Sequence, residues 1–197
     1  MSKYTKEAAI SVLHKAAVKY NQQLSQKRFL LIYQDYLTKN IKTSVITFKP
    51  INFKHLTGIQ SNIRPTQFYK ACLNQRLSPE DFNFDKLGYA QRKLEVLPFM
   101  PDVFFNRCWL GPSIKNDICI NADYYVGDTR CSLSIGIRIT DTGDVPVTLK
   151  KQSIREVVKK EYKVFAIASK PLGSNDATWK LTYCEKNFDA TRYLQCK

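Results

Sequence analysis

The stretch between residues 162 and 169 decides the fold, because it is the clearest buried strand in the chain. It reads Tyr162-Lys163-Val164-Phe165-Ala166-Ile167-Ala168-Ser169, a short apolar run rich in β-branched and aromatic residues. Upstream, residues 118–126 and 130–140 alternate with a period of two and are joined by Gly127-Asp128-Thr129, so they predict two more strands. Residues 178–184 predict a last strand.

A short helix is expected just before this buried strand. Ser153-Ile154-Arg155-Glu156 has the spacing of a capping box, in which serine and glutamate side chains satisfy the first free backbone N–H groups of a helix. We expect this helix to run through Lys160.

The first half of the chain is mostly helical by pattern. Residues 3–20 place apolar side chains at helical spacing, and residues 28–36 and 42–48 predict a hairpin around Thr38-Lys39-Asn40. An apolar and polar alternation then resumes over residues 51–59 and ends at Gly58. Further helices are expected over residues 65–76, from Ser78, over 87–97 and over 102–110.

These patterns predict an α+β domain, in which helices lead into a mostly antiparallel sheet of about four strands. The N-terminal helix and the hairpin precede that sheet. We divide the chain into an N-terminal helical extension (1–27), a central domain (28–171) and a C-terminal strand and tail (172–197) packed on the same domain.

Targeting signals and cysteines point to the cytoplasm of a producing or infected cell. No apolar signal region follows Met1, and apolar runs such as Phe29 to Tyr33 are too short to span a bilayer. None of the six cysteines forms a Cys-x-x-Cys pair, so we expect reduced thiols that pack as small apolar groups rather than a zinc site. No cofactor and no membrane contact are expected.

The charge of the chain predicts a polyanionic partner. Thirty-one Lys and Arg against seventeen Asp and Glu give a formal charge of +14, and a compact fold bears self-repulsion for such an excess. The excess is concentrated in residues 24–54 and 145–170. A basic surface that serves only solubility is the alternative.

His55 is the most informative single residue. RNA cleavage by its own 2′-hydroxyl needs one group that removes a proton near neutral pH and another that returns one, and imidazole suits either task. We expect His55 near a strand end, before Leu56-Thr57-Gly58. A hydrogen-bonded structural histidine is the alternative, and His14, on the polar face of the first helix, is expected only to be solvated.

Cations and hydroxyls elsewhere supply the rest of a predicted site. Lys150, Lys151 and Arg155 surround the expected short helix, where fixed positive charge would stabilise a phosphorane. Ser169 and Lys170 follow the buried strand, and we add Tyr69, Thr57 and Arg130 as substrate contacts. Solvated basic residues and a plain strand end are the alternatives, and for Tyr69 the helical spacing favours core packing.

Metal-dependent cutting is the competing chemistry, because magnesium requires converging carboxylates. The available acids are Asp123, Asp128, Asp141 and Asp144, and Asp141-Thr142-Gly143-Asp144 is more simply a turn. The chain has no Walker loop, no Gly-x-Gly-x-x-Gly, no Gly-x-Ser-x-Gly and no His-Glu-x-x-His. Nucleotide hydrolysis and serine-hydrolase chemistry therefore receive little support, and no metal ligands are predicted.

Several motifs in order resemble the phage-borne branch of the barnase–EndoU–colicin–RelE nuclease fold. They are Phe53-Lys54-His55-Leu56-Thr57-Gly58-Ile59, Phe68 to Leu73, Leu77 to Phe82, Lys93-Leu94-Glu95-Val96-Leu97-Pro98 and the block from Val147 to Lys170. The resemblance covers about residues 28–170. It implies helices before a four-stranded antiparallel sheet and a metal-independent ribonuclease of phages or mobile elements, some of which act as toxins or against host systems.

Carried over by residue, the resemblance assigns His55 and Thr57 to the histidine motif and Lys150 and Arg155 to the basic helix. It assigns Ser169 and Lys170 to the end of the final strand. This chain lacks a second histidine in the sheet. Lys150, Lys170 or Tyr69 would have to take its place.

The sequence thus predicts an endoribonuclease in which His55, Lys150, Ser169 and Lys170 are catalytic. Thr57, Tyr69, Arg130, Lys151 and Arg155 are the predicted substrate contacts. The target is either RNA in general or one structured host RNA, such as a transfer RNA or a CRISPR guide. The alternative is a non-catalytic basic protein that grips a nucleic acid or a ribonucleoprotein and blocks it, as an anti-CRISPR inhibitor would. Any immunity partner is invisible in the sequence.

Overall fold

The computed structural model describes residues 4–114, 122–129, 132–173 and 178–195. Its α-helices are α1 (Lys6–Gln23), α2 (Asn52–Thr57), α3 (Pro65–Leu73), α4 (Tyr89–Val96), α5 (Ile154–Val157) and α6 (Thr191–Leu194), and its 3-10 helices are η1 (Pro79–Asp81) and η2 (Leu97–Phe104). Its strands are β1 (Lys27–Gln34), β2 (Ile41–Phe48), β3 (Trp109–Pro112), β4 (Tyr124–Asp128), β5 (Leu133–Arg138), β6 (Val145–Lys150), β7 (Tyr162–Pro171) and β8 (Lys180–Cys184).

All eight strands belong to one antiparallel sheet. Its order is β2-β1-β7-β3-β4-β5-β6, and β8 pairs with β7 as well. The α+β class is therefore confirmed, whereas the expected number of about four strands is too low. The number of strands is larger because β7 pairs with β1 along one edge and with both β3 and β8 along the other. The hairpin β1–β2 and the later strands, which are separate in the sequence, therefore join in one sheet.

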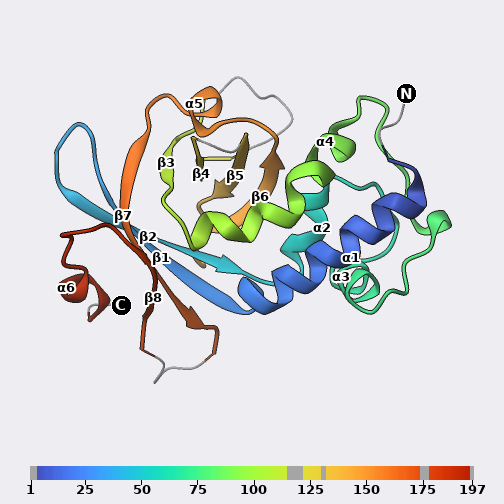
Figure 1. Ribbon diagram of the computed structural model, residues 1–197, viewed down its shortest axis with the longest axis horizontal. Coiled ribbons are helices and arrows are strands. Elements are labelled where there is room, and N and C mark those ends of the chain that lie inside the picture. Colours follow the sequence, from blue (N-terminus) through green and yellow to red (C-terminus); the bar gives the residue numbers. More distant parts are fainter. Residues whose placement is uncertain (1–3, 115–121, 130–131, 174–177, 196–197) are drawn as a thin grey trace.

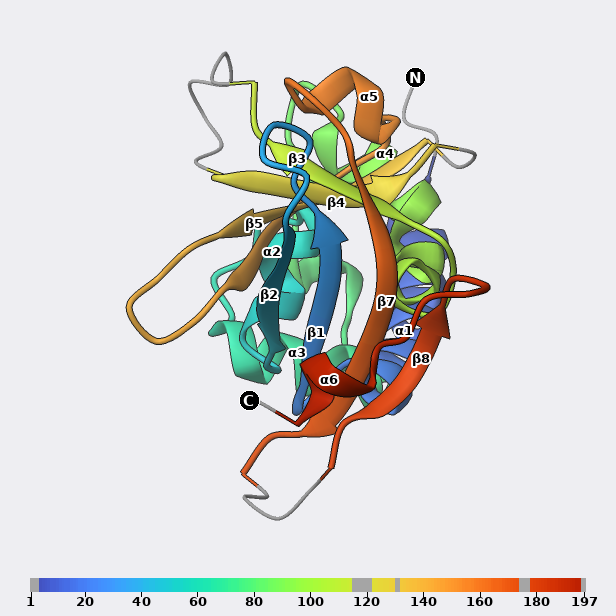
Figure 2. The same ribbon diagram turned by 90° about the vertical axis from the view of Figure 1, so that its left-hand side faces the viewer.

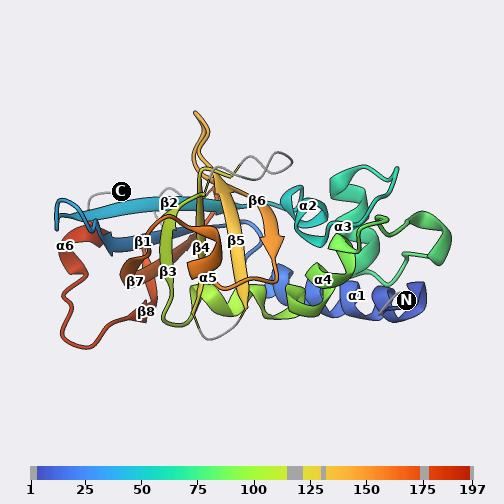
Figure 3. The ribbon, with the colours of Figure 1, turned by 90° about the horizontal axis from the view of Figure 1, so that it is seen from above.

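The sheet curls until its two outer strands meet. The backbone N–H of Thr47 in β2 donates to the carbonyl of Asp144, just before β6, at 2.8 Å. The Asp144 carboxylate accepts hydrogen bonds from Ser44 and from Tyr124, both at 2.6 Å. This contact makes one end of the sheet nearly a closed barrel, and α1 to α4 gather beside it in Figures 1 and 3.

The main core lies between the concave face of the sheet and these helices. The buried face of α1 contributes Leu13, Ala17 and Tyr20, and the Tyr20 ring packs edge-on against Phe53 of α2 and Tyr69 of α3. A second cluster on the outer face of β1 and β7 is covered by the C-terminal segment around Trp179 and α6, which Figure 2 shows in front of these strands. No helix of the described ranges is both long and apolar enough for a bilayer.

Two expected elements are wrong. The segment 51–59 was predicted as extended, but its residues Asn52–Thr57 form helix α2, because Phe53, Leu56 and Thr57 lie three and four residues apart and pack inward as one face of a helix. Residues 102–110 were predicted as one helix. Instead, the 3-10 helix η2 ends at Phe104 and strand β3 begins at Trp109. Helix α5 starts at the predicted capping box but ends at Val157 rather than Lys160.

The cysteines of the described residues are free thiols. Cys72 and Cys108 are buried and Cys184 is exposed. Burial raises the pKa of the Cys72 thiol to about 12 and also raises that of Cys108. Cys119, Cys131 and Cys196 lie outside the described residues.

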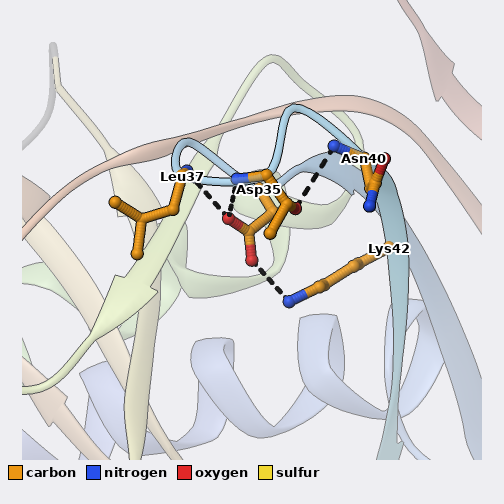
Figure 4. A network of polar contacts seen from close by, with 5 residues as sticks. Asp35, Leu37, Asn40 and Lys42 are labelled. Atoms are coloured by element: carbon orange, nitrogen blue, oxygen red, sulfur yellow. Dashed lines mark hydrogen bonds and ion pairs between the residues drawn. The ribbon is translucent and has the colours of Figure 1, made fainter.

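The turn of the β1–β2 hairpin is organised by Asp35 (Figure 4). Its carboxylate accepts the backbone N–H groups of Leu37 at 2.9 Å and Thr38 at 3.1 Å and pairs with Lys42. Its own backbone N–H donates to the carbonyl of Asn40 at 2.9 Å. The Lys42 bond is the largest cause that lowers the pKa of Asp35 from 3.8 to about 2.

We predict that Asp35→Ala lowers the melting temperature at pH 7. Because the folded-state pKa lies below the ordinary value, the stabilisation exists above about pH 4 and is lost as the pH falls towards 2. Asp35→Asn, which keeps an acceptor for the turn but loses the charge, should melt between Asp35→Ala and wild type. A difference between variants that stays constant from pH 7 to 2 in thermal melts would contradict this role.

Candidate active site

The His-Leu-Thr-Gly motif forms the last turn of α2 and turns His55 outward. Leu56 and Thr57 are fully buried, while His55 is an exposed residue. The Thr57 hydroxyl donates to the Lys54 carbonyl at 2.7 Å and accepts the Ile59 N–H at 3.1 Å. Thr57 therefore ends the helix, and its burial does not support the predicted contact with substrate.

Gly58 serves two purposes at the end of α2. Its φ of 70° is left-handed, a conformation that glycine adopts without steric cost. A Cβ at this position would lie 2.8 Å from Cδ of Lys93 in α4. Glycine thus leaves the space through which the Lys93 side chain passes.

Lys93 reaches from α4 to the sheet. Its Nζ donates to the hydroxyl of Thr148 in β6 at 3.2 Å. Thr148 is itself buried and packs against Gly136 of β5, where an added Cβ would come within 2.5 Å of its methyl group. The amine is therefore held by a fixed partner rather than extended into water.

Burial and like charges shift the pKa values of both groups. Partial burial, followed by the charges of Lys54, Lys93 and Arg138, lowers the pKa of His55 below 6.5. Burial is also the largest cause that lowers the pKa of Lys93 from 10.5 to about 8, and Lys150 lowers it further, against an opposing effect of Asp85. Near neutral pH, His55 is mostly neutral and Lys93 mostly protonated.

These interactions define a cluster at the junction of α2, α4, β5 and β6. We call it the His55–Lys93 cluster, and its members are His55, Lys93, Arg138, Thr148 and Lys150. It combines a neutral base, a cationic acid and two further cations in one region. Such a set can move protons and stabilise developing negative charge on a phosphate.

Of the three cations predicted near α5, one belongs to the His55–Lys93 cluster and two form ion pairs with acids. Lys150 joins the cluster and lies 5.3 Å from the centre of the Tyr125 ring. Lys151 forms an ion pair with Glu95 of α4, and Arg155 pairs with Glu161 at 3.0 Å. The charges of Lys151 and Arg155 are thus partly neutralised by acids close at hand.

Ser169 and Lys170 lie away from the cluster. The strand register carries Lys150 across β5, β4 and β3 to Lys163, at the start of β7. Ser169 is six residues further along β7, roughly 20 Å, and pairs with Phe29 of β1. The Lys170 ammonium lies 4.7 Å from the centre of the Trp179 ring, so the structure does not bring Ser169 and Lys170 together with His55 and Lys150.

Two other residues considered from the sequence have structural surroundings. Tyr69 is 3% exposed, packs against Tyr20 and Phe53, and donates to the Asn21 side chain at 2.9 Å, in agreement with core packing and not with base stacking. His14 is half-buried, and its ring nitrogens contact the Cys72 carbonyl and the Gln75 amide rather than only water. Arg130 lies outside the described residues.

Two of the acids considered as metal ligands, Asp123 and Asp144, take part in separate hydrogen bonds. Asp144 closes the sheet, and the Asp123 carboxylate accepts the Ile139 N–H at 2.7 Å. Within the described ranges, no three His, Cys, Asp or Glu residues gather in a way that could hold a metal ion.

Sequence reasoning missed Lys93, Arg138 and Thr148 as members of a site. Lys93 lies in a segment that carries the family resemblance, but no local signal distinguishes it from other helical lysines. Its one sequence signal is distant, because Gly58 is left without a side chain where Lys93 must pass.

Comparisons with known proteins identify the family of this chain. Neither the curated proteins nor the solved structures include a match to it. A family model described as phage-Barnase-EndoU-ColicinE5/D-RelE like nuclease4 matches residues 12–186, nearly the whole chain. The match includes most of α1 and both sides of the His55–Lys93 cluster. The chain therefore belongs to this family of phage-type nucleases (PBECR4).

Proposed function

We propose that this nuclease cleaves RNA by transesterification, with His55 as general base and Lys93 as general acid. The observation that supports this assignment most is the pair of lowered pKa values in one cluster, which leaves a neutral imidazole and a protonated amine available together. Groups whose pKa values lie near the working pH are the effective proton donors and acceptors.

In the proposed step, His55 takes the proton of the 2′-hydroxyl and the 2′-oxygen attacks the adjacent phosphorus. The bond from phosphorus to the 5′-oxygen breaks, and Lys93 gives its proton to that leaving oxygen. The products are a 2′,3′-cyclic phosphate and a 5′-hydroxyl. Lys150 and Arg138 face the added negative charge of the phosphorane.

This assignment answers the lack of a second histidine in the sheet. Lys93 takes the place that the sequence alone had offered to Lys150, Lys170 or Tyr69. A partly buried lysine with a pKa of about 8 can release a proton near neutral pH, which an exposed lysine does poorly. We propose RNA as the target. It is either RNA in general or a structured RNA, such as a transfer RNA or a CRISPR guide.

We expect His55→Ala to lower the cleavage rate by about 10²- to 10⁴-fold, the usual effect of a general base. His55 is an exposed residue, so the fold should be unaffected. His14→Gln, which removes the other imidazole, should keep the wild-type rate. Product ends identified by RNA sequencing and by mass should be cyclic phosphates, with and without EDTA. A full rate in His55→Ala, or wild-type cleavage that EDTA abolishes, would contradict the mechanism.

Binding without any product, on bulk RNA and on the RNA of cells that express the protein, would favour the non-catalytic inhibitor instead. In that case binding should still weaken steeply with salt, since counterion release from phosphates needs no chemistry.

The cleavage rate should show a bell-shaped dependence on pH. Activity rises as His55 loses its proton, below pH 6.5, and falls as Lys93 loses its proton, near pH 8. In Lys93→Arg the guanidinium stays protonated, so the alkaline decline near pH 8 should disappear and the rate should drop about 10²-fold. An unchanged alkaline limb in kcat for Lys93→Arg would remove Lys93 from the proposed role.

Lys93→Met should lose activity and gain stability at neutral pH. The folded-state pKa lies below the ordinary 10.5, so the charged amine destabilises the fold, and wild type gains stability as pH rises from about 8 to 10.5. We expect Lys93→Met to be more stable by about 1–2 kcal/mol at pH 7, allowing for the missing Thr148 bond, with the gap closing above pH 10. Denaturant melts that show a less stable variant would mean that Lys93 is a structural residue.

A further inference from the structure

An exposed tyrosine at the tip of the β1–β2 hairpin is in contact with two lysines. Tyr36 is 46% exposed. The Lys39 ammonium lies 4.4 Å from the centre of its ring, and that of Lys160 lies 3.1 Å from it. Lys160 comes from the segment between α5 and β7, which Figure 2 shows beside the hairpin tip. We call Tyr36, Lys39 and Lys160 the hairpin-tip clamp.

The clamp keeps its positive charge, whereas neighbouring cations are neutralised. Lys42 pairs with Asp35, and Lys163 pairs with Glu185. Within the ranges that the structure describes, neither Lys39 nor Lys160 forms an ion pair with an acid. Cation–π contacts with the Tyr36 ring position both ammoniums close to each other. Two unneutralised cations held in this way suit an anion such as phosphate.

The clamp lies on the same face of the sheet as Lys150. Cross-strand partners share a face, so the register places Lys150, Ser134, Gly127, Trp109 and Lys163 in one row on the outer face. Gly111, two residues after Trp109, faces the same way, and a Cβ there would lie only 2.0 Å from the Lys160 carbonyl. The backbone of Lys160 therefore crosses this face.

The distance between the two regions suits a polymer rather than a single small anion. Four steps between strands separate Lys150 from Lys163, roughly 20 Å along the curved sheet. The exposed cation Lys159 lies on the segment that joins them. A strand of nucleic acid that enters the His55–Lys93 cluster can thus extend across α5 to the hairpin tip.

We propose that the hairpin-tip clamp binds a backbone phosphate of the RNA substrate several nucleotides from the cleaved bond. This inference rests on the proposed function, because it takes the polymer to be RNA. It assigns the clamp to substrate affinity and to the choice of longer RNA over short fragments, and not to the chemical step. Because phosphates are common to all sequences, the clamp adds no base specificity.

The test measures binding of 2′-O-methyl oligonucleotides, which lack the attacking hydroxyl and stay intact. A trinucleotide and a dodecanucleotide are titrated against wild type and Lys39→Ala/Lys160→Ala over a series of salt concentrations. Lys15→Ala/Lys70→Ala, which removes two exposed lysines of α1 and α3, is the control for net charge. Lys39→Arg/Lys160→Arg keeps the charge at the clamp and should bind like wild type.

We expect the clamp double variant to bind the dodecanucleotide about tenfold more weakly, with a salt dependence reduced by about 0.7 for each phosphate that the clamp no longer neutralises. Trinucleotide binding and the rate of cutting a short RNA should match wild type. Equal weakening in the Lys15→Ala/Lys70→Ala control would show diffuse attraction only and overturn the inference.

Unchanged dodecanucleotide binding by the clamp variant would also overturn the inference. The same holds if the clamp variant binds phosphatidylserine vesicles more weakly than wild type does but binds the dodecanucleotide equally well. These outcomes differ from failure of the proposed function, in which wild type cuts no RNA at all.

Discussion

The partly buried ammonium of Lys93 is the constraint on which the site depends. Its side chain leaves α4, passes the bare backbone of Gly58 at the end of α2, and donates to Thr148 of β6. Three elements distant in sequence must therefore pack around one amine. Burial of that amine costs folding energy, and the lowered pKa is the direct expression of the cost. A destabilising group of this kind persists where function requires it.

The curled sheet explains why β6 is available to the helices. Asp144 ties the start of β6 to Ser44 of β2, and Tyr124 contributes to the same contact. Because β2 leads through Phe48 into α2, closing the sheet brings the end of β6 beside the helix that carries His55. The histidine and the strand thus meet as a consequence of barrel closure. A flat sheet would keep them at opposite edges.

Much of the fold could be predicted from local patterns. The hairpin, the buried strand β7 and the capping box of α5 each depend on residues close together in sequence, and each is confirmed. Helix α2 was not predicted because a six-residue helix is too short for its period to be separated from that of a strand. Strand β3 was missed because it has four residues and includes Gly111 and Pro112, which ordinarily break strands.

The site was predictable only in part, since it depends on register and closure. His55 and Lys150 were identified by their chemistry, and folding brings both into one cluster. Ser169 and Lys170 also had suitable chemistry, but the register of β7 places them at its far end. Lys93 could not be chosen among many lysines until Gly58 and Thr148 were seen on either side of it.

The central claim is that Lys93 is a desolvated amine at the centre of the site, and a carbon-13 NMR titration of its Cε tests this most directly. The resonance can be assigned by its absence in Lys93→Arg. We expect a titration midpoint of about 8, well below the ordinary 10.5 of a lysine amine. A midpoint near the ordinary 10.5 would show a solvated side chain and would contradict this claim.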